Sequence, residues 1–83
     1  MKAYTMQNNQ VITISKGEKY FFSYGTLIAK YDVNNTLYVD SYYWNYSRTT
    51  LKYFKQFLNT TKSKKELIVW LQEHAIFADL QGK

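Results

Sequence analysis

The spacing of apolar residues along this 83-residue chain changes near the middle, and this change constrains the fold most. Up to about residue 40 the apolar and β-branched residues repeat with a period of two, which is typical of strands. Beyond about residue 47 the period is close to 3.6, which is typical of amphipathic helices. The sequence therefore predicts an α+β domain with its strands first and its helices second.

Four extended segments are expected in the first half of the chain. They cover residues 10–15, 18–24, 26–32 and 36–40. Lys16 and Gly17 form the first turn, because glycine accepts the positive φ of a tight hairpin. Asn34 and Asn35, which tolerate the left-handed conformation, form the last turn. Gly25 is interpreted as a bulge or bend within one long strand, since one residue is too short for a hairpin loop. The result is an antiparallel β-meander of three to four strands.

Two helices are expected in the second half, over residues 48–59 and 64–75. Ser47 is the N-cap of the first helix. Its apolar face consists of Leu51, Phe54, Phe57 and Leu58. Ser63 and Glu66 have the spacing of a capping box at the start of the second helix. The inward residues of this helix are Leu67, Trp70, Leu71 and Ala75. We expect an αα-hairpin packed on one face of the sheet.

The composition predicts a single domain, residues 1–83, because a second core does not fit in this length. The chain has no cysteine, so disulfides and thiolate metal sites are excluded, and its 19% of aromatic residues must supply the core. Residues 1–10 are polar and lack the apolar core of a signal peptide. The uncharged apolar stretch from Tyr20 to Ala29 is about half as long as a membrane helix. We therefore expect a cytoplasmic protein with no membrane partner.

Catalytic residues are not expected. His74 follows Glu73 directly, and neighbouring side chains on a helix point about 100° apart, so the two cannot act together on one substrate. The carboxylates and single histidine make a poor metal site, and no glycine-rich loop could bind a nucleotide phosphate, so no metal and no cofactor are expected. Asp32 and Asp40 flank one hairpin and are the remaining alternative, a nuclease-type carboxylate pair.

The positive charge is concentrated in one segment. Between Ser41 and Lys65 there is no acidic residue, and there are six cationic ones: Arg48, Lys52, Lys55, Lys62, Lys64 and Lys65. The first three share a helical face, where like charges repel by a few tenths of a kcal/mol per pair. This stripe is either a solvated face or a contact for an anionic partner.

An aromatic run, residues 42–46, directly precedes the cationic helix. If Trp44 and Tyr46 enter the core, Tyr42, Tyr43 or both remain near the surface beside Arg48 and Lys52. Aromatic rings next to cations occur in single-stranded nucleic-acid sites and in protein hot spots. The predicted contact residues are Tyr42, Tyr43, Arg48, Lys52, Lys55 and Lys62.

One group of residues resembles a known family. The group is Ser23-Tyr24, Thr26, Ile28-Ala29, Trp44, Tyr46-Ser47, Thr49-Thr50 and Phe57-Leu58. It resembles a family of small uncharacterised proteins encoded by phages and prophages of Gram-positive bacteria, over about residues 18–58. The resemblance implies a phage accessory protein and offers no enzyme activity or catalytic residue to carry over.

Two functions remain open. The first is a phage-encoded, non-catalytic protein in the host bacterial cytoplasm that binds and inhibits or modulates a host protein, such as a restriction or CRISPR nuclease. The second is direct binding of DNA or RNA by the cationic helix and its aromatic neighbours.

Overall fold

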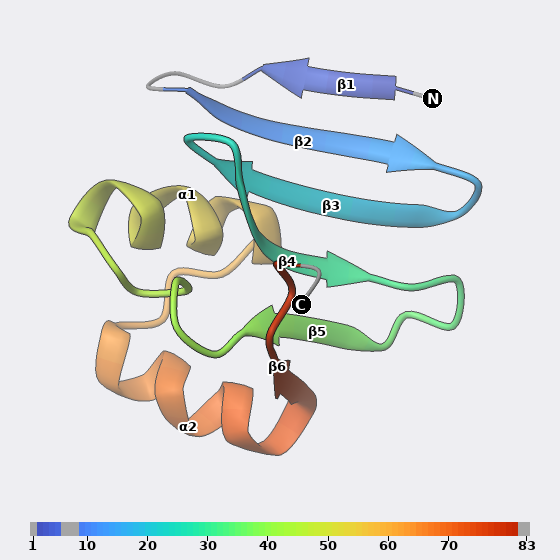
Figure 1. Ribbon diagram of the computed structural model, residues 1–83. Helices are drawn as coiled ribbons and strands as arrows, with labels where there is room; N and C mark the ends of the chain where they lie inside the picture. Colours follow the sequence, from blue (N-terminus) through green and yellow to red (C-terminus); the bar gives the residue numbers. More distant parts are fainter. Residues whose placement is uncertain (1, 6–8, 82–83) are drawn as a thin grey trace.

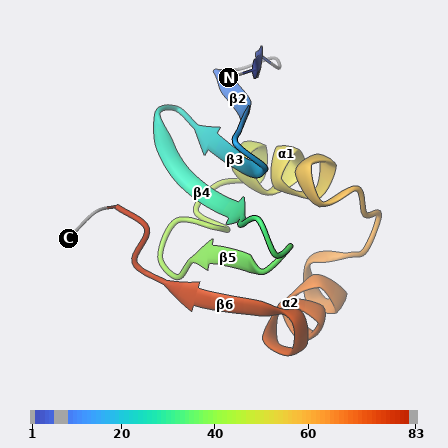
Figure 2. The ribbon, with the colours of Figure 1, turned by 90° about the vertical axis from the view of Figure 1, so that its right-hand side faces the viewer.

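Six strands form one sheet, and two helices cover one face of it, in the computed structural model (Figure 1). The structure describes residues 2–5 and 9–81. The strand order across the sheet is the order along the chain. Viewed from the side, α1 and α2 lie on the same side of the strands (Figure 2). The predicted α+β class is confirmed.

The strands of the sheet are β1 (Lys2–Thr5), β2 (Gln10–Ser15), β3 (Glu18–Ser23), β4 (Thr26–Tyr31), β5 (Leu37–Asp40) and β6 (Ala75–Ala78). The helices are α1 (Arg48–Leu58) and α2 (Lys64–His74). Strands β1 to β5 are antiparallel neighbours, whereas β6 is parallel to β5. The four predicted strands and both helices are present, and β1 and β6 were not predicted.

The turn between β3 and β4 corrects the interpretation of Gly25. Ser23 pairs with Thr26, so that Tyr24 and Gly25 form a two-residue loop between two separate strands. Their φ values of 51° and 80° are both positive, as a type I′ turn requires. The prediction of one long strand was wrong because Tyr24 adopts a left-handed conformation that non-glycine residues rarely adopt.

A bulge does occur in this hairpin, but within β4. The register changes between Phe21, which pairs with Ala29, and Phe22, which pairs with Leu27. Ile28 is the extra residue, and its side chain is buried in the core. The bulge therefore adds an apolar side chain to the core.

β6 follows α2 without a turn. Helix α2 ends at His74, and Ala75 is already extended, with φ −124° and ψ 155°. β6 then pairs in parallel with β5, with Ala75 opposite Leu37 and Phe77 opposite Val39. A parallel neighbour needs a crossover connection, and α1 with α2 supplies it. This topology explains why both helices lie on one face.

The core lies between the sheet and the two helices. Phe21 of β3 stacks on Phe54 and Phe57 of α1, with ring centroids 6.2 and 5.6 Å apart. Leu67 and Leu71 of α2 are fully buried in the same cluster. The predicted apolar faces of both helices therefore pack against the sheet, except that Ala75, expected in the second helix, is the first residue of β6. The capping box of Ser63 and Glu66 is present.

A buried hydroxyl network fixes the start of α1 against the end of β3. The side-chain oxygens of Ser23 and Thr50 are 2.8 Å apart, and both residues are buried. Ser47 accepts the N–H of Thr50, as an N-cap does, and its hydroxyl donates to the Thr50 oxygen at 3.0 Å. The chain just before Ser47 is therefore held at the end of the sheet that also carries the β3–β4 turn.

Candidate binding surface

Three tyrosines form a continuous aromatic strip between β5 and α1. The rings of Tyr42 and Tyr43 meet edge to face at 4.7 Å, and those of Tyr43 and Tyr46 at 5.8 Å. Tyr42 is 73% exposed and Tyr46 is 65% exposed, whereas Tyr43 is half-buried against the core. We call Tyr42, Tyr43 and Tyr46 the tyrosine surface.

The segment that carries the tyrosine surface is a series of turns and not an extended strand. Trp44 is buried and meets the rings of Phe54 and Phe77 at 6.2 and 6.3 Å. The expectation for Trp44 is therefore confirmed, but Tyr46 faces solvent and does not enter the core. The strict alternation on which that expectation rested does not apply within turns.

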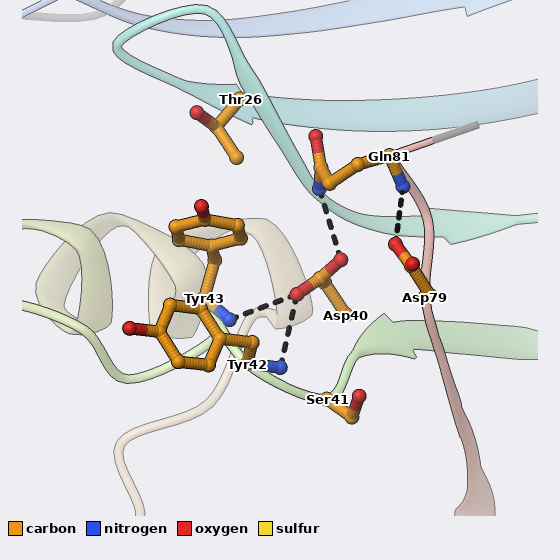
Figure 3. A pocket seen from close by; sticks show the side chains of 7 residues that line it. All are labelled: Thr26, Asp40, Ser41, Tyr42, Tyr43, Asp79 and Gln81. Carbon is orange, nitrogen blue, oxygen red and sulfur yellow. Dashed lines mark hydrogen bonds between the residues drawn. The ribbon is translucent and has the colours of Figure 1, made fainter. Parts of the chain in front are cut away.

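Asp40, the last residue of β5, holds this segment in place (Figure 3). Its Oδ1 accepts the N–H groups of Tyr42 and Tyr43 at 3.0 and 2.8 Å. Its Oδ2 accepts the N–H of Leu80 at 3.0 Å and the side-chain amide of Gln81 at 2.9 Å. Gln81 also donates to the carbonyl of Leu27 at 2.7 Å. One carboxylate thus joins the tyrosine segment, the residues after β6 and the start of β4.

The environment of Asp40 favours its charged form. Only 1% of the residue is exposed. Burial acts to raise its pKa, but the hydrogen bonds from Gln81, Tyr43, Leu80 and Tyr42 outweigh burial and lower the pKa below its ordinary value of 3.8. The charge is therefore stabilised by four N–H donors.

A cavity of about 460 Å³ opens beside Asp40. It is lined by Thr26, Asp40, Ser41, Tyr42, Tyr43, Asp79 and Gln81. Asp79 accepts the backbone N–H of Gln81 at 3.0 Å. The immediate neighbours of Tyr42 and Tyr43 in this cavity are thus two carboxylates and several neutral polar groups. Among residues 2–5 and 9–81, no histidine, lysine or arginine lines this cavity to pair with them in acid–base chemistry.

The predicted cationic residues lie on and after α1. Arg48 is the first residue of α1, and it and Lys52 are exposed, whereas Lys55 is partly buried. The Lys52 ammonium lies 5.5 Å from the ring of Tyr53. Lys62 is exposed in the connection to α2. Among the residues the structure describes, the rings of Tyr42, Tyr43 and Tyr46 contact one another. The nearest of the predicted cations in the sequence is Arg48, two positions after Tyr46.

The alternative carboxylate pair is not formed. Asp32 and Asp40 lie at opposite ends of the β4–β5 hairpin, where Tyr31 pairs with Leu37 and Ala29 with Val39. Asp32 instead accepts the N–H groups of Asn34 and Thr36 within its own turn. Aspartate at this position therefore stabilises the turn, as such residues commonly do.

His74 is exposed at the end of α2. Its Nδ1 is 3.0 Å from the carbonyl oxygen of Trp70, and its ring stacks on the Trp70 ring at 4.8 Å. Within residues 2–5 and 9–81, no three His, Cys, Asp or Glu side chains gather closely enough to hold a metal ion. The same part of the chain has no helix that is long and apolar enough to cross a membrane.

The fold and surface define a small α+β domain in which a five-stranded antiparallel meander is extended by a parallel strand after two helices. The chain belongs to a family of unknown function (DUF8033), whose match covers residues 2–74. That range includes the tyrosine surface, Asp40 and the predicted cationic residues. No curated protein and no solved structure matches the chain.

Proposed function

We propose that the protein is a non-catalytic binding protein that docks another protein on its tyrosine surface. The observation that carries this proposal is the exposure of Tyr42 and Tyr46, at 73% and 65%. Tyrosine is enriched at binding hot spots, because a rigid ring covers a large contact area with only two rotatable side-chain bonds. Isolated exposed apolar residues need no explanation, but three connected rings do.

Preorganisation supports the same function. The backbone under Tyr42 and Tyr43 is held by the Asp40 carboxylate, and the backbone after Tyr46 is held by the Ser47 cap. A surface that is already ordered loses less conformational entropy when a partner binds. The tyrosine surface is therefore better suited to binding than an unanchored loop with the same side chains.

The partner we propose is a host protein, met in the cytoplasm of a bacterial host. This rests on the resemblance to phage and prophage proteins, and a restriction or CRISPR nuclease whose inhibition protects a phage is a fitting candidate. Arg48, Lys52, Lys55 and Lys62 would then lie around the contact and accelerate association with an acidic protein surface, because charges at a rim chiefly steer encounter.

A matched set of variants tests the proposal. A host partner captured from nuclease-treated lysate is titrated against the wild-type protein, the double variant Tyr42→Ala/Tyr46→Ala and the control Val33→Ala. Val33 is 63% exposed in the β4–β5 turn, at the other end of the sheet. We expect the double variant to bind about tenfold to a thousandfold more weakly. Equal affinity of the double variant and the control would refute the proposal.

Direct binding of DNA or RNA is the second candidate, favoured by the six cations and the absence of acids between Ser41 and Lys65. If Arg48, Lys52 and Lys55 contact phosphates, log affinity should fall linearly with log salt, with a slope of about −2 to −3. The triple variant with glutamine at these positions should abolish this slope. No binding to single- or double-stranded probes at about 50 mM salt eliminates the candidate.

A further inference from the structure

β6 is an outer strand of the sheet, and its free edge is apolar. The strand order places β6 last, and among the described residues no strand lies on its outer side. Ile76 is 49% exposed and Phe77 is 38% exposed, and the strand Ala75–Ala78 carries no charge. Edge strands are normally protected from pairing by being very short, by charged side chains, proline or a bulge, or by a covering helix or loop. β6 is short, at four residues, but it has neither charge nor proline.

The backbone of β6 presents hydrogen-bonding groups on this edge. Ser41 donates its N–H to the carbonyl of Ala78 at 2.9 Å, so the polar groups of Ala78 point toward β5. In a strand the N–H and C=O of alternate residues point to opposite sides. The N–H and C=O of Phe77 therefore point away from β5, where an added strand could bond to both.

The charge around β6 differs from that of the rest of the chain. The net charge of the whole protein is +5, but residues 66–81 contain no lysine or arginine. The charged residues of that segment at neutral pH are Glu66, Glu73 and Asp79. Two copies that meet at β6 therefore bring together segments without lysine or arginine, each with a small net negative charge, and not the basic segment of residues 48–65.

We propose that β6 pairs with β6 of a second copy, antiparallel across a twofold axis, to form a homodimer with a continuous sheet. Phe77 then lies opposite Phe77 of the second copy, and the two residues exchange N–H···O bonds. In this register Asp79 lies opposite Ala75 of the second copy and beside its exposed His74. The twofold axis repeats this contact between Asp79 and His74, and the two edges are complementary in hydrogen bonding.

The pairing should be weak and reversible. A four-residue edge is small compared with the roughly 1,200 to 2,000 Å² that stable interfaces bury. We therefore expect a dissociation constant between about 10 µM and 1 mM, and a monomer at lower concentration.

Sedimentation equilibrium tests this proposal over total concentrations from about 1 µM to 1 mM. The weight-average mass of the wild type should rise from 9.9 kDa toward twice that value. Ile76→Lys, which adds a charge beside the twofold axis, should weaken dimerisation at least about tenfold. Val33→Lys, the same type of change at the 63% exposed Val33, should dimerise like the wild type. A wild type that stays monomeric throughout, or an Ile76→Lys variant that dimerises normally, overturns the proposal.

Hydrogen exchange of the wild type supplies a measurement that does not depend on the folding of a variant. The amide of Phe77 should exchange more slowly as the protein concentration rises, because only the dimer gives it an acceptor. The amide of Ala78, which points toward β5, should be protected at every concentration. Exchange of Phe77 that is independent of concentration while the mass increases would locate the dimer contact elsewhere.

Discussion

The two ends of the sheet are stabilised by different kinds of contact. At the end that carries the tyrosine surface, Asp40 accepts four N–H groups from two parts of the chain, residues 42–43 and residues 80–81. At the other end, Phe57 packs its ring against Phe21 and Tyr31, each at 5.6 Å, and the Lys19 ammonium lies 5.1 Å from it. One end therefore depends on a buried charge and the other on apolar packing.

This difference explains how the protein keeps large rings in solvent at one end. The polar contacts of Asp40 fix the backbone of Tyr42 and Tyr43 without using their side chains. At the apolar end the aromatic side chains themselves provide the stabilisation, and burial raises the pKa of Tyr31. At the polar end, Tyr42 and Tyr46 therefore remain exposed and available for a partner.

The largest expected effect is at the apolar end. Phe57→Ala removes a ring that is 3% exposed, and it should destabilise the protein by about 3 to 5 kcal/mol. Chemical denaturation followed by tryptophan fluorescence measures this change. A variant that unfolds near the wild-type midpoint would show that packing at Phe57 is not what stabilises this end.

Asp40→Asn is the matching change at the polar end. The new amide nitrogen, itself a donor, must face either the N–H groups of Tyr42 and Tyr43 or those of Leu80 and Gln81. We therefore expect the free energy of unfolding to fall by about 2 kcal/mol. Asp32→Asn is the control, because Asp32 uses only Oδ1 and lies in an exposed turn, and it should cost less than about 1 kcal/mol. Equal losses of stability in both variants would contradict the expectation that the buried carboxylate of Asp40 stabilises the fold more than the turn carboxylate of Asp32.

The pH dependence of stability should differ between the wild type and Asp40→Asn. The pKa of Asp40 is lowered in the folded state, so the unfolded state binds more protons just below pH 3.8. The stability from Asp40 is therefore complete above the unfolded pKa and is lost as the pH falls through the folded pKa. The difference between wild type and Asp40→Asn should shrink over that window. Denaturation curves from pH 7 to below 3.8 measure it, and a constant difference would contradict the assignment.

The smallest expected effect on stability is at the tyrosine surface. Tyr42→Ala and Tyr46→Ala each remove a largely exposed ring, so each should change the free energy of unfolding by less than about 0.5 kcal/mol. The same denaturation assay measures this change. A loss above about 2 kcal/mol would mean that these rings mainly stabilise the fold and are not a surface available for binding.

Local patterns in the sequence were sufficient for most of the fold. Ser47, Ser63 and Glu66 cap the helices as predicted, because a cap depends on residues three positions apart. The β3–β4 turn was misinterpreted, since it requires Tyr24 to adopt a positive φ that its residue type does not favour. β6 was missed because its four residues follow the helix directly and are stabilised by pairing with β5, far away in sequence.

The candidate site was predictable only in part. The exposure of Tyr42 and the burial of Trp44 agree with the sequence pattern, but Tyr46, considered together with Trp44 as a core residue, is exposed. The role of Asp40 could not be predicted, because two of its four donors lie about 40 residues further along the chain. The one available signal was an aspartate at the end of a predicted strand, because aspartate commonly accepts backbone N–H groups two or three positions further on in a turn.

The separation between Asp40 and its distant donors also bears on the order of events during synthesis. Leu80 follows Asp40 by 40 residues, which a ribosome adds in about 2 to 8 s. During that interval the carboxylate has only the nearby amides of Tyr42 and Tyr43 and solvent as donors. β5 also lacks its parallel neighbour until β6 has been made. The nascent meander can therefore form first, and the tyrosine segment reaches its final anchorage only when the residues after β6 emerge.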